Sequence, residues 1–284
     1  MANQKLITLI DGSVYAESVC DHAAWIAQRS QADVTLLHVI GRRQASRQDV
    51  SGTLALGARS SMLEELTRLE GDMARVAQQH GRALLDGAAD RIAATGHQRP
   101  ETRLRIGDLI EETNEALSEA SMLVIGKRGE AADFARLHLG SNLERMVRSS
   151  AKPIFVASRT FKPIKRLMIA YDGHSPSRKA VEAIGTDPLF KDLEIKLLMV
   201  GEDDETNRAR LNEPVQLLKN SGLSVSAELV SGQPVDVISA KAGTDEFDLL
   251  VMGAYGGGRL RSMFIGSTTT EMLISCRVPV LLFR

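Results

Sequence analysis

The sequence repeats itself over a long interval, and this constrains the fold more than any other feature. An apolar segment ending in Asp-Gly occurs at Asp11 and again at Asp172, 161 residues later. The next apolar segments, 34–39 and 195–200, keep the same separation of 161 residues. Because the interval is far longer than the roughly 20–50 residues of solenoid repeats, it predicts two similar domains in one chain.

The two copies differ by one change in length. Near their ends, the apolar segments 153–156 and 279–282 are separated by only 126 residues, so the first copy is longer after its second strand. Its extra chain is a polar stretch, 41–59, followed by 61–94, where apolar residues recur at helical spacing and predict a helix. These apolar residues are Met62, Leu63, Leu66, Leu69, Met73, Val76 and Ala77.

Each copy alternates predicted strands with predicted helices. Strand segments such as 122–125 and 249–252 are continuous apolar runs, as expected where helices cover both faces of a parallel sheet. The fold class is therefore predicted to be α/β, with two tandem doubly wound parallel-sheet domains of Rossmann-like type at 1–159 and 164–284. The short polar link at 158–163 leaves little slack, so we expect the domains to pack together.

Composition argues against several kinds of partner. The chain has 35 Lys and Arg and 36 Asp and Glu, which give a net charge of -1, and aromatic residues make up only 4%. Both features argue against binding to nucleic acid. No apolar run approaches the roughly 20 residues that cross a bilayer, so we expect no membrane association.

The two cysteines, Cys20 and Cys276, are far apart, which argues against a disulfide or a thiolate metal site. We expect a cytoplasmic protein.

A glycine pattern follows the predicted fourth strand of the second copy. Gly253 and Gly256 are followed, after nine residues, by Gly266, Ser267 and Thr268. Open α/β sheets bind ligands at the carboxyl ends of their strands, which is where this pattern lies. Glycine lets backbone N–H groups approach an anion, and a helix predicted to begin here would attract phosphate. The alternative is a glycine-rich turn before an ordinary helix.

With this pattern, the sequence resembles the universal stress protein family in its tandem form, over nearly all of its 284 residues. The resemblance implies an adenine nucleotide alpha hydrolase-like fold that binds ATP, with or without Mg²⁺. It implies that the residues of the glycine pattern hold the ribose and phosphates, with Asp172 and the backbone of Val200 beside the adenine. A carboxylate at a strand end can accept from an amine. The alternative for Asp172 is a turn residue that caps the next helix.

The first copy departs from the glycine pattern because ten residues, rather than nine, separate its two glycine groups. The insert carries Glu130 and Asp133, which would repel phosphate. Nearby cations that could offset this repulsion are Lys127, Arg128, Arg136 and His138. We expect ATP in the second copy, and a first-copy site that is weak, altered or empty. The site in the first copy would comprise Asp11, Val39, Gly126, Gly129, Gly140 and Ser141.

Catalytic signatures are missing from the sequence. It has no G-x-G-x-x-G after its first strand, no G-x-x-x-x-G-K-[ST], no G-x-S-x-G and no H-E-x-x-H. Together with the family resemblance, which implies ATP binding that serves stress signalling, this absence predicts at most slow hydrolysis and no assigned catalytic or metal-binding residue. One alternative is a nucleotide-independent scaffold, or a binder of another ligand in the first copy. Another is an adenylating enzyme, which the missing S-G-G-x-D-S signature opposes.

The fifth predicted strands, 153–157 and 279–283, end their domains and are expected to present edges that pair. This pairing, which the family resemblance suggests, predicts a pseudo-dimer within the chain. We also expect that unit to be doubled into a homodimer.

Overall fold

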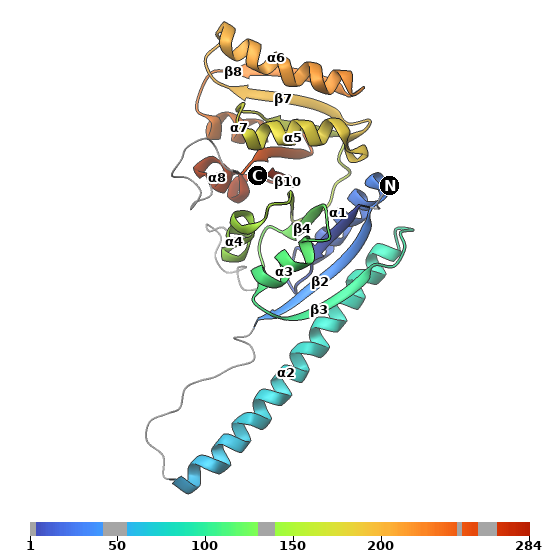
Figure 1. The fold of residues 1–284 in the computed structure, drawn as a ribbon, viewed down its shortest axis with the longest axis vertical. Helices are drawn as coiled ribbons and strands as arrows, with labels where there is room; N and C mark the ends of the chain where they lie inside the picture. The colour runs from blue at the N-terminus through green and yellow to red at the C-terminus, as the bar shows by residue number, and fades with distance from the viewer. Residues whose placement is uncertain (1–3, 42–55, 130–139, 243–245, 255–265) are drawn as a thin grey trace.

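The computed structural model describes most of the chain. Backbone and side chains are described for 4–41, 64–129, 140–242, 246–254, 266 and 268–284, and the backbone alone for 56–63 and 267. Within these ranges strands alternate with helices, and ten strands form one sheet (Figure 1). The α/β class and the internal duplication are therefore confirmed.

The first half of the chain builds five parallel strands in the order β3-β2-β1-β4-β5. Their bounds are β1 (Lys5–Leu9), β2 (Asp33–Gly41), β3 (Glu101–Gly107), β4 (Met122–Gly126) and β5 (Ile154–Ala157). The strand order reverses between β1 and β4. Such a reversal is the place where a doubly wound sheet opens a crevice at its carboxyl edge.

The second half repeats this order as β8-β7-β6-β9-β10, again with parallel neighbours. Its strands are β6 (Arg166–Ala170), β7 (Glu194–Val200), β8 (Ser224–Val230), β9 (Leu249–Gly253) and β10 (Val280–Phe283). The corresponding reversal lies between β6 and β9. Each half therefore has one reversal of strand order, and the two reversals lie at equivalent places in the repeat.

Helices cover both faces of the sheet and create two apolar cores. One core packs α1, α2, α5 and α6 against one face, and the other packs α3, α4, α7 and α8 against the opposite face. Successive strand residues alternate between the two cores, as Leu6 and Ile7 do. The helices are α1 (Ala16–Ser30), α2 (Leu56–Ala93), α3 (Leu109–Leu117), α4 (Ser141–Ser149), α5 (Ser175–Thr186), α6 (Glu205–Asn220), α7 (Pro234–Ala242) and α8 (Ser267–Ser275), with a short 3-10 helix η3 (Pro188–Phe190).

The two halves are joined by antiparallel pairing of β5 with β10, in which Phe155 lies opposite Leu281. The expectation that the fifth strands pair within the chain is confirmed. The division at 1–159 and 164–284 stays a prediction, since the sheet runs without interruption through both halves.

Side chains of α1 add further links across this junction. Arg29 donates from Nε to the carbonyl of Leu189 at 2.8 Å, and its guanidinium also bonds the carbonyl of Lys191. The Ser18 hydroxyl donates to the carbonyl of Ser158 at 2.8 Å. Helix α1 therefore holds η3 and the segment after β5 in place.

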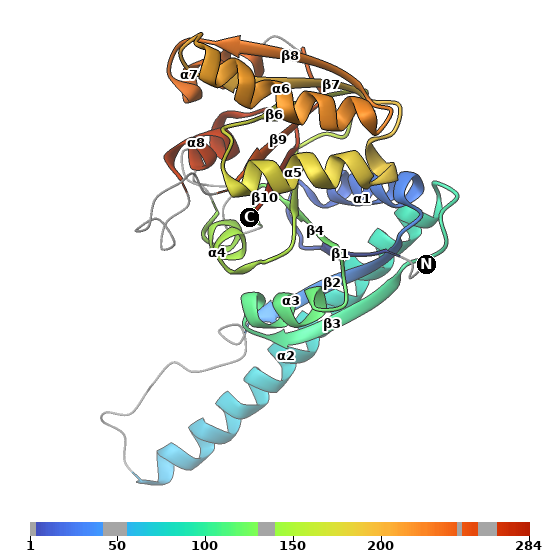
Figure 2. The same cartoon turned by 45° about the horizontal axis from the view of Figure 1, so that its top comes forward.

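Helix α2 confirms the predicted helix, but three of the apolar residues that predicted it, Leu69, Met73 and Val76, are exposed. Its end near the sheet is packed, and Leu85, Ala89 and Ile92 are buried there. Figure 2 shows the rest of α2 extending away from the body. Although α2 is long, no helix in the described part of the chain combines the length and apolar character needed to span a bilayer.

His22 on α1 is a buried ionisable group at the junction. Its ring centroid lies 5.3 Å from that of Phe155 and 5.0 Å from that of Phe161. Nδ1 bonds the carbonyl of Ser18 at 2.7 Å, whereas Nε2 has no partner among the described residues. Burial lowers the pKa of His22 from 6.5 to about 4, because a charged ring would lose its hydration.

This lowered pKa predicts a specific sensitivity to acid. Between pH 6.5 and pH 4 the unfolded chain binds a proton that the folded His22 does not, so the free energy of unfolding falls as the pH falls. At pH 5 the loss relative to neutral pH is about 2 kcal/mol from this residue. Urea unfolding at pH 7 and pH 5 should show that His22→Gln loses about 2 kcal/mol less than the wild type. The exposed His80→Gln should behave as the wild type; equal losses in all three proteins would contradict this origin.

Candidate functional site

The carboxyl ends of three neighbouring strands define the candidate site in the second half. Strand β6 lies between β9 and β7, with Ala170 paired to Met252. Gly253 ends β9 and Val200 ends β7, while Asp172 follows β6 by two residues. The sheet therefore brings three of the predicted site residues to one edge, at the point where the strand order reverses.

Helix α8 begins beside this edge and is tied to it by Thr269. The Thr269 hydroxyl lies 3.3 Å from the carbonyl oxygens of both Gly253 and Ala254. Gly266 is the N-cap residue, and its carbonyl accepts from the N–H of Thr270 at 3.0 Å. Because Gly266 has no side chain to cap the helix, the first N–H groups of α8 keep their capacity to bind an anion. Sequence reasoning had not assigned Thr269 this positioning role.

The two described glycines of this pattern have different structural reasons. A Cβ on Gly253 would lie 2.9 Å from the Cβ of Pro176 and 3.3 Å from the N of Ser177, so packing against α5 requires a glycine here. Gly266 has φ of -56°, which any residue can adopt, and a Cβ would meet no described atom closer than 3.8 Å. The packing of the described residues therefore gives no reason for Gly266.

Asp172 forms a turn that leads into α5. Its Oδ1 accepts from the N of His174 at 2.9 Å and from the hydroxyl of Ser177 at 2.6 Å. Its Oδ2 lies 3.1 Å from Nδ1 of His174. The turn that the sequence left open as an alternative is therefore present, but Asp172 does not cap the helix: the N-cap residue of α5 is His174, which has no side-chain cap. Since the Asp172 side chain is 51% exposed, it also remains accessible to a ligand.

The other predicted residues of this site are described to different extents. Val200 is half-buried at the end of β7, and the following Gly201 donates to the carbonyl of Val230 at 3.0 Å. Thr268 is half-buried in the first turn of α8. Gly256 and the side chain of Ser267 lie outside the described residues.

The first-half site has a carboxylate close to its glycine loop. A Cβ on Gly129 would lie 3.1 Å from Oδ2 of Asp11, and Oδ1 of Asp11 accepts from the N of Ser13 at 3.1 Å. Gly140 is the N-cap of α4 and lies near the loop, because its Cβ would be 3.9 Å from the carbonyl oxygen of Lys127. Three of the predicted residues therefore meet here, with a negative charge among them.

The remaining first-half residues are explained by local structure. A Cβ on Gly126 would lie 2.9 Å from the Cβ of Tyr15, so this glycine admits the start of α1. Val39 is half-buried in β2 and pairs with Arg105, and Ser141 is the exposed first residue of α4. The acidic insert with Glu130 and Asp133, together with Arg136 and His138, lies outside the described residues.

Lys127 does not serve the role that the sequence suggested. Its buried ammonium donates to the carbonyl of Cys276, at the end of α8 in the other half. Burial lowers the pKa of Lys127 to about 8 and raises the pKa of the Cys276 thiol. The hypothesis that Lys127 offsets phosphate repulsion in the first half is therefore wrong, because its charge caps a helix of the second half.

A reciprocal contact holds the end of α4. The guanidinium of Arg284, after β10, donates to the carbonyl of Arg148 and lies 3.5 Å from the carbonyl oxygen of Ser150. These contacts join residues 136 and 134 positions apart, and the Lys127 contact spans 149. Nothing local in the sequence signals either contact.

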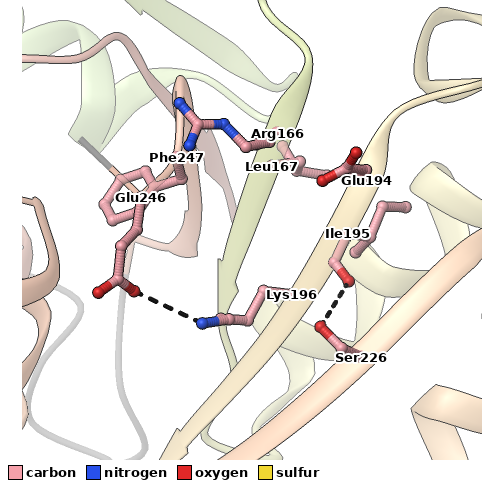
Figure 3. A pocket seen from close by; sticks show the side chains of 8 residues that line it. All are labelled: Arg166, Leu167, Glu194, Ile195, Lys196, Ser226, Glu246 and Phe247. Atoms are coloured by element: carbon pink, nitrogen blue, oxygen red, sulfur yellow. Dashed lines mark hydrogen bonds and ion pairs between the residues drawn. The ribbon is translucent and has the colours of Figure 1, made fainter. Parts of the chain in front are cut away.

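A hollow of about 90 Å³ lies at the amino ends of β6 and β7, at the opposite edge of the sheet from the candidate site (Figure 3). Arg166 and Glu194, the first residues of these strands, contribute to its wall. Lys196 lies 3.5 Å from Oε2 of Glu246 and 3.4 Å from Oε2 of Glu228, so its charge is matched within the protein. The full lining is Arg166, Leu167, Glu194, Ile195, Lys196, Ser226, Glu246 and Phe247.

This hollow is at the amino ends of the strands and is not the predicted site. Across the described ranges, no three His, Cys, Asp or Glu side chains gather in an arrangement suited to a metal ion.

Comparison with known proteins agrees with the geometry. The model of the universal stress protein family matches residues 2–158 and 187–284. The chain belongs to the universal stress protein family. The universal stress protein Slr1230 of Synechocystis sp. is 29% identical over 286 residues, which cover 99% of this chain and 100% of the relative. The tandem arrangement therefore extends over the full length of that relative.

Solved structures support the fold of the whole chain. A universal stress protein from Archaeoglobus fulgidus superposes with a TM-score of 0.71 at 20% identity, covering 100% of this chain and 99% of its own. Another universal stress protein, solved in complex with cAMP, is 22% identical and covers 43% of this chain with a TM-score of 0.38. The resemblance inferred from the glycine pattern is confirmed at the level of family and fold.

The different reasons for the two glycines can be tested by stability. Gly253→Ala should lower the free energy of unfolding by about 1–3 kcal/mol, because the new methyl group overlaps Pro176 and the backbone of Ser177. Gly266→Ala, whose Cβ would meet no described atom closer than 3.8 Å, should cost less than about 1 kcal/mol. Urea unfolding measures both, and equal losses would contradict the packing explanation.

Proposed function

We propose that this universal stress protein binds ATP in its C-terminal half and uses occupancy as a signal in the stress response. The observation that carries the proposal is the start of α8, where the N-cap residue Gly266 provides no side-chain cap beside the strand reversal. The ends of β6, β7 and β9 meet at the same edge. A glycine that the packing of the described residues does not require is accounted for by an anionic ligand that needs close backbone approach.

The proposed roles follow the positions of the residues. The phosphates and ribose contact Gly253 at the end of β9, Gly266 and Thr268 at the start of α8, and Gly256 and Ser267 of the same glycine pattern. The adenine lies toward Asp172 and the backbone of Val200. Asp172 accepts a hydrogen bond from the exocyclic amine while its Oδ1 keeps its bonds from His174 and Ser177. Mg²⁺, where present, accompanies the triphosphate.

The proposal is for binding with at most slow hydrolysis. Asp172 is one of the carboxylates that follow strands at this edge, and its oxygens are engaged with His174 and Ser177. A general base must reach the proton that it abstracts, and Asp172 is held at the start of α5 instead. Release of AMP or pyrophosphate by the purified protein would instead support an adenylating enzyme.

The site in the first half is less suited to ATP than the site in the second half. Asp11 places its carboxylate against Gly129, where a phosphate would be repelled. A weak, altered or empty site fits this arrangement, and so does a nucleotide-independent scaffold or a site for another ligand. We assign ATP to the second half alone.

We also propose that the protein works in the cytoplasm and forms a homodimer. Pairing of β5 with β10 already uses both fifth-strand edges within one chain. A homodimer must therefore form through another surface. Sedimentation equilibrium would measure its mass.

Nucleotide binding predicts a thermal and chemical stabilisation. With free ATP at a hundredfold excess over Kd, the free energy of unfolding should rise by about 2.7 kcal/mol. Gly266→Val should fold, because its Cβ would meet no described atom closer than 3.8 Å, but it should lose this response since the side chain obstructs the first turn of α8. Urea unfolding with and without ATP measures both proteins. A wild type that shows no response at millimolar ATP would overturn the proposal.

Assignment to one half predicts the stoichiometry. Isothermal titration should give one ATP per chain for the wild type. Gly140→Val, the matched change at the N-cap of α4, should leave that value unchanged, whereas Gly266→Val should abolish binding. Two ATP per chain, or loss of binding in Gly140→Val, would contradict the assignment.

A further inference from the structure

The outer part of α2 presents an apolar stripe with no packing partner among the described residues. The exposed fractions are 48% for Leu69, 64% for Met73 and 64% for Val76. Figures 1 and 2 both show this part of α2 extending beyond the sheet and the other helices. Exposure of three neighbouring large apolar side chains on one helix face marks an interaction surface.

The spacing of the stripe is that of a helix-pairing seam. Leu66, Leu69, Met73 and Val76 follow at intervals of three, four and three residues. This 3.5-residue average keeps the side chains facing a second helix along its length. In heptad terms Leu66 and Met73 occupy a positions, while Leu69 and Val76 occupy d positions. The seam is about 15 Å long at 1.5 Å per residue.

Acidic residues flank this seam. Glu65 and Asp72 occupy the g positions beside it, and Glu70 occupies the e position. These are the positions whose charges select the partner of a paired helix. Arg75 lies 3.4 Å from Oδ1 of Asp72, but its position is c, farther from the seam.

The base of α2 is firmly held, so the seam is presented in a defined direction. Gly81 allows close contact with β2 and β3, because a Cβ there would lie 2.8 Å from His38 and 2.8 Å from Leu104. Arg91 bonds both carboxylate oxygens of Asp21 on α1, at 2.7 and 2.9 Å. A surface that is already ordered loses less conformational entropy on binding.

We propose that the seam Leu66–Leu69–Met73–Val76 of α2 docks a basic amphipathic helix of a partner protein. The partner places apolar side chains against the seam and Lys or Arg opposite Glu65, Glu70 and Asp72. A second copy of α2 would bring these like charges together, which disfavours self-pairing. A membrane with anionic lipids would also be repelled by the acidic flanks. The charge of the surface therefore selects a basic protein helix.

The test uses the full-length protein and two synthetic probes. Both are 21-residue peptides with Leu at a and d; one has Lys at e and g, and the other has Glu. Fluorescence anisotropy at low salt should show the Lys peptide binding at least tenfold more tightly than the Glu peptide. Met73→Ser should weaken binding of the Lys peptide at least tenfold. The double variant Glu65→Lys/Glu70→Lys should reverse the preference between the peptides.

Gly71→Ser is the matched control. It lies about 160° around the helix from Met73, and a Cβ there meets no described atom within 4 Å, so binding should be unchanged. Circular dichroism checks that every variant keeps its helix. Equal binding of both peptides, or no binding of either at 200-fold excess of protein over labelled peptide and ~200 μM protein, overturns the proposal. Self-association of the wild type that Met73→Ser abolishes also overturns it, because the occupant is then a second copy.

Discussion

Antiparallel pairing of β5 with β10 is the constraint on which the rest of the structure depends. It converts two five-stranded sheets into one sheet of ten strands and joins cores that run along both faces. Around it, each half holds the end of a helix from the other: Lys127 caps α8, and Arg284 caps α4. Positive groups at these helix ends complement the negative end of the helix dipole. The junction is therefore fastened by backbone pairing and by charge.

Some residues at the candidate site hold α8 and β9 in place, and others are available to contact a ligand. Thr269 ties the start of α8 to the end of β9, and Lys127 holds its far end. Gly253 is required by contact with α5, whereas Gly266 is not required by any described neighbour. Glycines from one motif thus serve different purposes, and only a structure distinguishes them. The contrast makes Gly266 the position at which a substitution most directly tests the proposed ligand.

Much of the fold could be predicted because the evidence for it is local and occurs twice. The segment 195–200 lies within β7, and the helix expected after Gly266 is α8. The role of Asp172 could not be decided, because a carboxylate after a strand can cap a helix or meet a ligand. The contact of Lys127 with Cys276 depends on how the halves dock, which spacing within either half does not reveal. Apolar periodicity predicted α2 but could not show that the stripe through Met73 has no cover within the described chain.

Joining the two copies in one polypeptide releases them from symmetry. A dimer of identical single domains would repeat every substitution on both sides of its twofold axis. Here Lys127 corresponds in the repeat to Ala254, so one side of the junction carries a buried cation and the other a methyl group. Likewise Asp11 and Asp172 both accept from the N–H two residues further on, but Asp172 also accepts from the hydroxyl of Ser177, where the first copy has Ala16. The sequence around each strand reversal can therefore diverge independently while the shared sheet stays intact.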